Sequence, residues 1–190
     1  MTAHLEMQQY LKANLSKKRF THVMNVAAES RILAETFGGV APDTAYFAGM
    51  VHDICKEMDE SEQFNWMMRS DMGVCPEEQK SPKVWHGIAG ACYLREKFGV
   101  TDPDLLRAVR FHTVGRAGMS QLEKIVFLAD LTSAERTYPD VEHMREVVHR
   151  DLNDGMYEAV CFSIQKQLKR HGLLPHYTIE AYNEYAALQQ

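Results

Sequence analysis

Apolar residues recur along most of the chain at the spacing that a helix places on one face. The pattern is clearest between residues 18 and 37, where Val23, Val26, Leu33 and Phe37 follow the helical repeat. We find no convincing run in which apolar and polar residues alternate, as they do in a half-buried strand. The chain is therefore predicted to be all-α.

Prolines, glycines and capping residues predict where these helices begin and end. Proline is tolerated in the first turn of a helix, glycine often follows the last turn, and Ser120 with Glu123 has the pattern of a capping box. The predicted helices are residues 2–15, 18–37, 42–52, 59–66, 82–98, 102–112, a helix from 120, and 142–171 with a break near 153–155. Residues 70–80 and 113–118 are predicted loops, and a short tail follows Pro175.

The chain shows no internal repeat, low-complexity tract or linker, so we predict one domain across residues 1–190. Its 45% hydrophobic and 25% charged residues are typical of a globular protein with a sizeable core. The expected architecture is a single-domain helical bundle with a metal site between its helices.

Charge and cysteine spacing narrow the expected partners and location. A net charge of −5 disfavours nucleic acid as a partner but allows a local basic pocket for a phosphorylated small molecule. No apolar run approaches the roughly 20 residues that span a bilayer, and the polar N-terminus is unlike a signal peptide, so no membrane partner is expected. The four cysteines, Cys55, Cys75, Cys92 and Cys161, lack a C-x-x-C pair and are expected to be free thiols in the cytoplasm.

The dipeptide His52-Asp53 is the first candidate for chemistry. It follows the apolar stretch Ala48–Val51, and neighbouring helical side chains point about 100° apart, so both can flank one point in space. An imidazole with a carboxylate suits zinc, manganese or iron. The alternative is a core histidine followed by a polar residue at a helix end, and the dipeptide alone does not decide between the two.

His22 and Asp130 strengthen the interpretation of a metal site. His22 lies on the same face of its helix as Val26 and Leu33, where an imidazole without a partner is costly. Asp130 follows Ile125–Ala129, the most apolar run in the chain, where a carboxylate is rarely buried without a cation. The alternative for Asp130 is a helix-end carboxylate in solvent. The predicted metal ligands are His22, His52, Asp53 and Asp130.

Two further histidines extend this set. His86 lies one turn after Pro82, and His112 lies in the last turn of its predicted helix. Either can complete a second metal position or donate to a phosphate oxygen. Either can equally be a hydrogen-bonded histidine at the surface.

Cationic side chains near the predicted ligands indicate a phosphate substrate. Lys56 and Arg19 each lie within one helical turn of a predicted metal ligand. Phosphoryl transfer needs Lys or Arg, together with a metal, to neutralise charge on the phosphate oxygens. Arg107 and Arg110 are instead predicted to solvate a helix face.

The order and spacing of these residues resemble the HD superfamily of helical metal-dependent phosphohydrolases. In more detail, residues 17–183 resemble the YqeK group of bacterial symmetrical bis(5′-nucleosyl)-tetraphosphatases. The matching strings are Arg19–His22, Ala48–Lys56, Trp85–Gly87, Arg110–Arg116, Met119–Lys124 and Ala129–Asp130.

The resemblance implies an HD-type bundle that cleaves diadenosine tetraphosphate into two ADP by metal-activated water. The implied cofactor is iron, with manganese or zinc as alternatives and one or two ions. By position, His22, His52, Asp53 and Asp130 match the metal ligands. The implied substrate-binding residues are Arg19, His22, Lys56, His86, His112, Thr113, Asp130, Arg136 and Pro175. The residues assigned to catalysis are Asp53, Lys56, His86 and His112.

One segment departs from the family pattern. Members carry a string like Ile-Glu-Pro-Asn-Arg after the aspartate, whereas residues 131–136 keep the arginine, Arg136, without the proline and asparagine. The resemblance therefore does not define the helix geometry or the substrate selectivity at this segment.

Two other functions remain open at this point. The same metal site serves nucleotidases and deoxynucleotide phosphohydrolases, and a nucleotide-sensing domain without catalysis is a third class. The expected partner is a dinucleoside polyphosphate or a nucleoside diphosphate. No sequence pattern encodes the oligomeric state, and a homodimer is a hypothesis.

Overall fold

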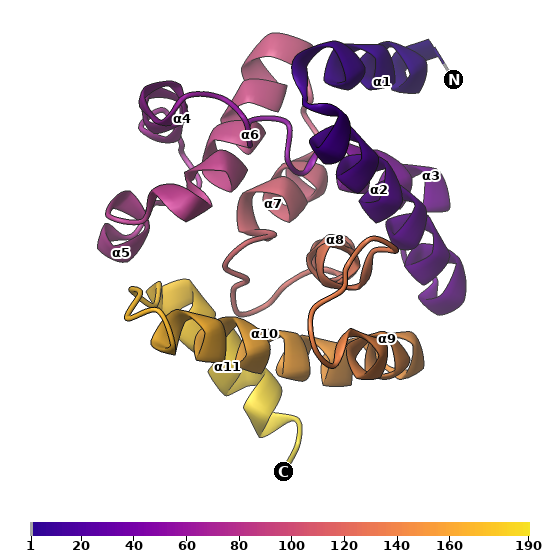
Figure 1. The fold of residues 1–190 in the computed structure, drawn as a ribbon, viewed down its shortest axis with the longest axis vertical. Helices are drawn as coiled ribbons and strands as arrows, with labels where there is room; N and C mark the ends of the chain where they lie inside the picture. Colours follow the sequence, from indigo (N-terminus) through magenta and orange to yellow (C-terminus); the bar gives the residue numbers. More distant parts are fainter. Residues whose placement is uncertain (1) are drawn as a thin grey trace.

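The structure is a computed structural model that describes the backbone of residues 2–190 and the side chains from residue 4 onward. This part of the chain forms eleven helices and no strand, so the all-α prediction is confirmed (Figure 1). The helices are α1 Thr2–Asn14, α2 Lys17–Phe37, α3 Pro42–Val51, α4 Glu60–Met67, α5 Pro76–Gln79, α6 Pro82–Phe98, α7 Pro103–Phe111, α8 Gln121–Thr132, α9 Val141–Arg150, α10 Leu152–Leu168 and α11 His176–Ala187.

Helix α8 lies at the centre of the bundle. It packs against α2, α3, α7, α9 and α10, and Figure 1 shows it between the N-terminal helices and the C-terminal group. All residues of Ile125–Ala129 are buried, as expected for a helix that is apolar all round. Its N-terminus has the predicted capping box, because Ser120 Oγ accepts from Glu123 N and the Glu123 carboxylate accepts from Ser120 N. The apolar run thus carries Asp130 into the middle of the molecule.

Two glycines let helices approach closely beside the predicted site. A Cβ on Gly49 of α3 would lie 2.5 Å from Ser30 Oγ and 2.9 Å from the carbonyl oxygen of Val26 on α2. A Cβ on Gly87 of α6 would lie 3.2 Å from the carbonyl oxygen of Arg110 on α7. A larger residue at Gly49 would push apart the two helices that precede His52 and carry His22.

Three predicted boundaries are wrong. The long C-terminal helix breaks at Asp151, not at 153–155, because the Asp151 carboxylate caps α10 by accepting from Asn153 N and Asp154 N. The loop at 70–80 contains the single turn of α5. The tail after Pro175 is the helix α11, whose face with Ala181 and Tyr185 is buried in the core.

The cysteines agree with the prediction of free thiols, since all four are unpaired in the described chain. Within residues 2–190, no helix is both long enough and apolar enough to cross a membrane.

Candidate metal centre and active site

Two of the predicted site histidines lie one residue past a helix end, in the same local arrangement. His52 follows α3 and His112 follows α7. In each, Nδ1 lies 2.7 Å from the carbonyl oxygen three residues earlier, that of Gly49 or Val109. An Nδ1–H that donates to a carbonyl leaves Nε2 as the atom available to a metal. Both residues are buried, so these helix ends direct two imidazoles inward.

His22, on the buried face of α2, has carboxylates at both ring nitrogens. Nδ1 contacts the carboxylate of Glu135, and Nε2 lies 3.1 Å from Asp130 Oδ1 and 3.6 Å from Asp53 Oδ2. Burial disfavours the charged imidazole, but the carboxylates of Asp130 and Glu135 outweigh it and raise the pKa of His22 to about 9. The imidazole of the metal-free protein is therefore protonated at neutral pH.

One oxygen of Asp53 faces the side of the site formed by α2. Asp53 Oδ2 accepts a hydrogen bond from Arg19 Nη1 at 2.6 Å and lies 3.5 Å from His52 Nε2. Burial alone would raise the pKa of this carboxyl, but its histidine neighbours, His52 first, hold it well below its ordinary value. Asp53 is therefore an anion in a buried position.

The other oxygen of Asp53 faces α6 and α7. Asp53 Oδ1 lies 3.2 Å from His86 Nε2 and 3.5 Å from His112 Nε2, and these two nitrogens are 3.2 Å apart. Both histidines are buried, so the alternative of surface histidines is wrong. Lys56 Nζ lies 3.3 Å from each ring nitrogen of His86, and burial, the largest influence, lowers the pKa of His86 to about 4. His86 is accordingly neutral.

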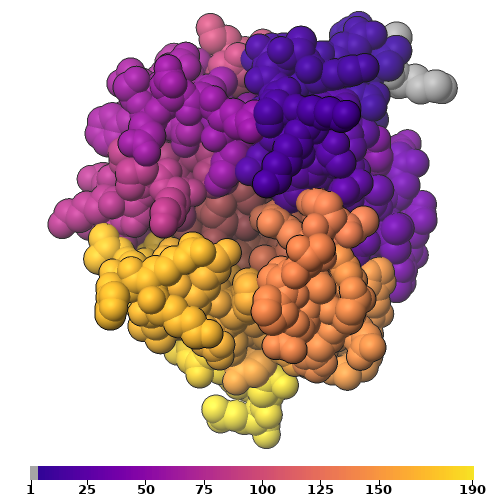
Figure 2. Space-filling view, in the orientation of Figure 1, coloured from indigo at the N-terminus to yellow at the C-terminus, as the bar shows by residue number. Residues whose placement is uncertain are grey.

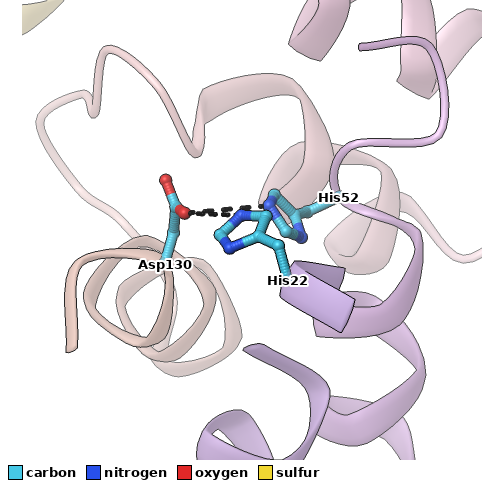
Figure 3. Close-up of side chains that lie close together, drawn as sticks. All are labelled: His22, His52 and Asp130. Carbon is cyan, nitrogen blue, oxygen red and sulfur yellow. Dashed lines mark ion pairs between the residues drawn. The ribbon is translucent and has the colours of Figure 1, made fainter. Parts of the chain in front are cut away.

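Asp130 lies in the last turn of α8 and is held by Arg136. Arg136 Nε donates to the Asp130 carbonyl oxygen at 2.6 Å, and Nη2 donates to its carboxylate. Figure 3 shows the Asp130 carboxylate directed at the rings of His22 and His52. The alternative of a helix-end carboxylate facing solvent is therefore wrong.

The donor atoms fit a metal ion. One oxygen or nitrogen from each of His22, His52 and Asp130 lies within 4.8 Å of the others, and so does a set from His52, Asp53 and His112. Three buried atoms within these sets have no hydrogen-bond partner among the described residues: His22 Nε2, His52 Nε2 and Asp53 Oδ1. Such atoms are costly unless a cation or water satisfies them. Imidazole nitrogens with carboxylate oxygens suit a divalent transition metal.

Two adjoining clefts open beside these residues, and we name them by what lines them. The basic cleft, of about 710 Å³, is lined by Lys18, Arg19, His22, Leu131, Glu135, Arg136, Thr137, Tyr138, Pro139, Phe162, Gln165, Lys166, Lys169 and Arg170. The Pro175 cleft, of about 300 Å³, is lined by Lys56, Lys83, Val84, His112, Thr113, Val114, Phe127, Asp130, Leu131, Phe162, Ser163, Lys166, Gln167, Arg170, Leu174, Pro175 and Thr178. Figure 2 shows this face hollowed where the indigo, magenta, orange and yellow parts of the chain meet.

The sequence model of the HD domain matches residues 19–135, which include all four predicted metal ligands. The chain belongs to the HD domain family.

Relatives of this HD protein match most of its length. The symmetrical bis(5′-nucleosyl)-tetraphosphatase of Halalkalibacterium halodurans is 33% identical over 93% of each chain. The protein of the same name from Bacillus subtilis is 32% identical over 79% of this chain and 80% of its own. A crystal structure described as a predicted HD superfamily hydrolase involved in NAD metabolism, from Clostridium acetobutylicum, superposes with a TM-score of 0.91 at 30% identity over 96% of both chains.

The structure brings every predicted site residue of the HD protein to one region. Nearly all of the predicted substrate-binding residues line one of the two clefts. Arg19, His22 and Arg136 line the basic cleft, and Lys56, His112, Thr113, Asp130 and Pro175 line the Pro175 cleft. His86 lies behind them, against Lys56 and His112. The roles assigned to these residues stay predictions.

The prediction that Arg110 solvates a helix face is wrong. Its side chain is fully buried and forms two hydrogen bonds with the equally buried carboxylate of Glu78, at 2.8 and 2.7 Å. Arg110 Nη2 also donates to the carbonyl oxygen of Gly73. Arg110 therefore attaches residues 73–78 to α7, one residue before Phe111 and two before His112. Arg107 is at the surface as predicted, with 39% of its side chain exposed.

Sequence reasoning did not single out Glu135, although it contacts His22. Its carboxylate also accepts from Asn25 Nδ2 at 2.7 Å and from Ser133 Oγ at 2.9 Å. Glu135 lies in the segment that departs from the family string. The sequence signal that could have found Glu135 is its position next to Arg136, five residues after the predicted ligand Asp130.

Metal affinity of the HD protein is expected to rise with pH up to about 9. A metal at His22 Nε2 must displace the proton held there, so affinity should rise about tenfold per pH unit below the pKa of about 9 and then level off. The measurement is calorimetric titration with Mn²⁺ at several pH values, in buffers of different ionisation heat. One proton should be released per ion, and pH-independent affinity between 7 and 9 would contradict this assignment.

The raised pKa of His22 also affects the stability of the metal-free protein. The pKa of His22 in the fold, about 9, is above the ordinary value of 6.5, so its protonation favours the folded state. This contribution is fully present below about pH 6.5 and is lost as the pH rises through about 9. Denaturant titrations of chelator-treated protein should show the loss, and His22→Gln should remove it.

Glu135→Gln is expected to weaken metal binding by about 10- to 100-fold, because a carboxylate behind a ligand histidine orients the ring and raises its basicity. The measurement is chelator competition at pH 9, where little proton competition remains at His22. Glu142→Gln is the control, since Glu142 is exposed and bound only to Arg145 within the described chain. Equal affinities of the two variants would mean that Glu135 does not support the ligand.

Proposed function

We propose that this protein is a metal-dependent hydrolase that cleaves dinucleoside tetraphosphates, diadenosine tetraphosphate first, symmetrically into two nucleoside diphosphates. The observation that carries the proposal is the convergence of His22, His52, Asp53 and Asp130 beside two clefts rich in Lys and Arg. The names of the relatives from Halalkalibacterium halodurans and Bacillus subtilis support the substrate and the position of cleavage.

His22, His52, Asp53 and Asp130 hold the metal in this proposal. A divalent cation bound there supplies two kinds of chemistry, acidifying a water molecule and offsetting negative charge on phosphate oxygens. We propose iron, with manganese and zinc as the alternatives. A second ion would use His112 with His52 and Asp53, whose donor atoms also lie close together.

Asp53 orients the attacking water in this scheme. Its Oδ1 is buried and lacks a hydrogen-bond partner among the described residues, so it can accept a hydrogen bond from a water molecule beside it and thereby orient that water. Arg19 holds the opposite oxygen at 2.6 Å and thereby fixes the rotation of the carboxylate.

Lys56 and His112 contact the phosphate in this proposal, and His86 supports them. The leaving group is a nucleoside diphosphate, whose terminal phosphate has a second pKa near 6, so it departs as an anion and needs cations more than a general acid. Lys56 lines the Pro175 cleft and can donate to a non-bridging oxygen. Neutral His86, against Lys56 and His112, positions both groups.

The test is product analysis of diadenosine tetraphosphate hydrolysis by protein loaded with iron, manganese or zinc. ADP is expected as the sole nucleotide product, two per substrate. ATP with AMP, or no turnover with any of the metals, would contradict the proposal. A panel of nucleoside monophosphates and deoxynucleotides, compared by kcat/KM, separates the alternative of another HD-type nucleotidase.

Elemental analysis of freshly purified protein identifies the metal and its stoichiometry together. A cytoplasmic location and a homodimer stay predictions.

A further inference from the structure

The two clefts share a wall. Leu131, Phe162, Lys166 and Arg170 line both of them. His22 lines the basic cleft and Asp130 lines the Pro175 cleft, and His22 Nε2 lies only 3.1 Å from Asp130 Oδ1. The candidate metal residues therefore stand at the junction of the clefts. Volumes of about 710 and 300 Å³ fall in the range typical of pockets for small molecules.

The basic cleft carries positive charge that the protein itself leaves unpaired. Within residues 2–190, Lys18, Lys166, Lys169 and Arg170 form no ion pair, although the whole chain has a net charge of −5. Lys166 lies close enough to Arg170 and Arg136 that burial and these two cations lower its pKa. An anionic ligand would offset this positive charge.

The lining of the basic cleft also includes apolar and aromatic residues. The rings of Tyr138 and Phe162 lie 4.8 Å apart at an angle of 31°, next to Leu131 and Pro139. Tyr138 is oriented by the hydrogen bond that its hydroxyl donates to the carbonyl oxygen of Leu131. Aromatic rings of this kind stack on nucleobases without requiring a particular base. The cleft thus combines cations for phosphate with a surface for a base.

We propose that the basic cleft binds the second nucleoside diphosphate half of the substrate, while the first half occupies the Pro175 cleft. This inference rests on the proposed function. Lys18 and Lys169 contact the phosphates of the second half, and Tyr138 contacts its base. The central phosphoric anhydride then lies at the junction of the clefts, beside the metal residues. Cleavage at the centre follows from this placement, because each cleft retains one half.

The first test counts binding sites on the metal-loaded enzyme. Calorimetric titration should show two ADP bound per chain, and one molecule per chain of a diadenosine tetraphosphate analogue whose central oxygen is a methylene group. One ADP per chain at saturation would overturn the inference.

The second test uses matched variants. Lys18→Ala with Lys169→Ala should weaken analogue binding about tenfold, which corresponds to about 1.4 kcal/mol, and should remove the weaker of the two ADP sites. Tyr138→Leu should also weaken binding of the analogue and of the second ADP. Lys12→Ala with Lys80→Ala removes the same charge at exposed positions outside both clefts and should leave both sites intact.

The outcomes separate the two proposals. If the unmodified enzyme cleaves diadenosine tetraphosphate but the Lys18 and Lys169 variant binds the analogue as tightly as the control variant, the second half-site is rejected alone. If the unmodified enzyme releases no ADP, the proposed function is rejected whatever the number of ADP molecules bound.

Discussion

Asp53→Asn is expected to lower kcat/KM for diadenosine tetraphosphate by about a thousandfold or more. The substitution keeps the shape of the side chain and removes its charge. Asp53 lies within 3.6 Å of four histidines and Arg19 at once, so the loss affects metal binding and water orientation together. The measurements are steady-state kinetics and metal content by elemental analysis.

Asp43→Asn is the matched control for this variant. Asp43 also accepts from an arginine at 2.6 Å, that of Arg31, but it is exposed on the first turn of α3. The Asp43→Asn variant should retain normal activity and metal content. A circular dichroism spectrum of the Asp53 variant should show intact helices. If that variant kept its metal and more than about a tenth of its activity, Asp53 would not be the central residue of the site.

Arg110→Ala is expected to lower the free energy of unfolding by about 3–5 kcal/mol. The substitution leaves the Glu78 carboxylate buried without its cation, and such an uncompensated charge is far more costly than the loss of an exposed pair. The Gly73 carbonyl also loses its donor. Denaturant unfolding of the metal-free protein gives the change directly.

Arg107→Ala is the control on the same helix, because Arg107 is partly exposed and pairs only loosely with Asp104, at 3.5 Å. Its effect should stay within about 0.5 kcal/mol. Joint replacement of Arg110 and Glu78 by Met and Leu should recover much of the lost stability, since well-packed apolar residues often replace a buried pair. Equal stability of the two single variants would show that the buried pair contributes no more than a surface one.

The helical class and most helix boundaries were predictable because they depend on local spacing. The run Ile125–Ala129 implied a buried helix, and the Ser120–Glu123 pattern correctly marked its start. The helix α11 was missed because its apolar residues are mostly alanine and tyrosine, and its buried face becomes visible only when Ala181 and Tyr185 contact the core. Tertiary contacts, more than local sequence, therefore define α11.

The candidate site shows the same difference between what local sequence predicts and what only the folded chain determines. His22, His52, Asp53 and Asp130 were predicted together because imidazoles and carboxylates beside apolar runs are unusual. Glu78 and Arg110, 32 residues apart, gave no joint signal, since pairing of two charges is a property of the folded chain. Glu135 likewise gave no joint signal with His22, because their contact depends on how closely α2 approaches the segment after α8 in the folded chain.

The helix ends that hold His52 and His112 have an electrostatic consequence. The backbone dipoles of a helix sum to roughly half a negative charge at its C-terminus. Helices α3 and α7 end immediately before these histidines, and α8 ends two residues after Asp130. Three helix C-termini thus lie beside the candidate metal residues, while the N-terminus of α2 lies by Lys18 in the basic cleft. The backbone alone therefore provides a field that favours a cation at the junction and an anion beside it, and no side-chain substitution removes it.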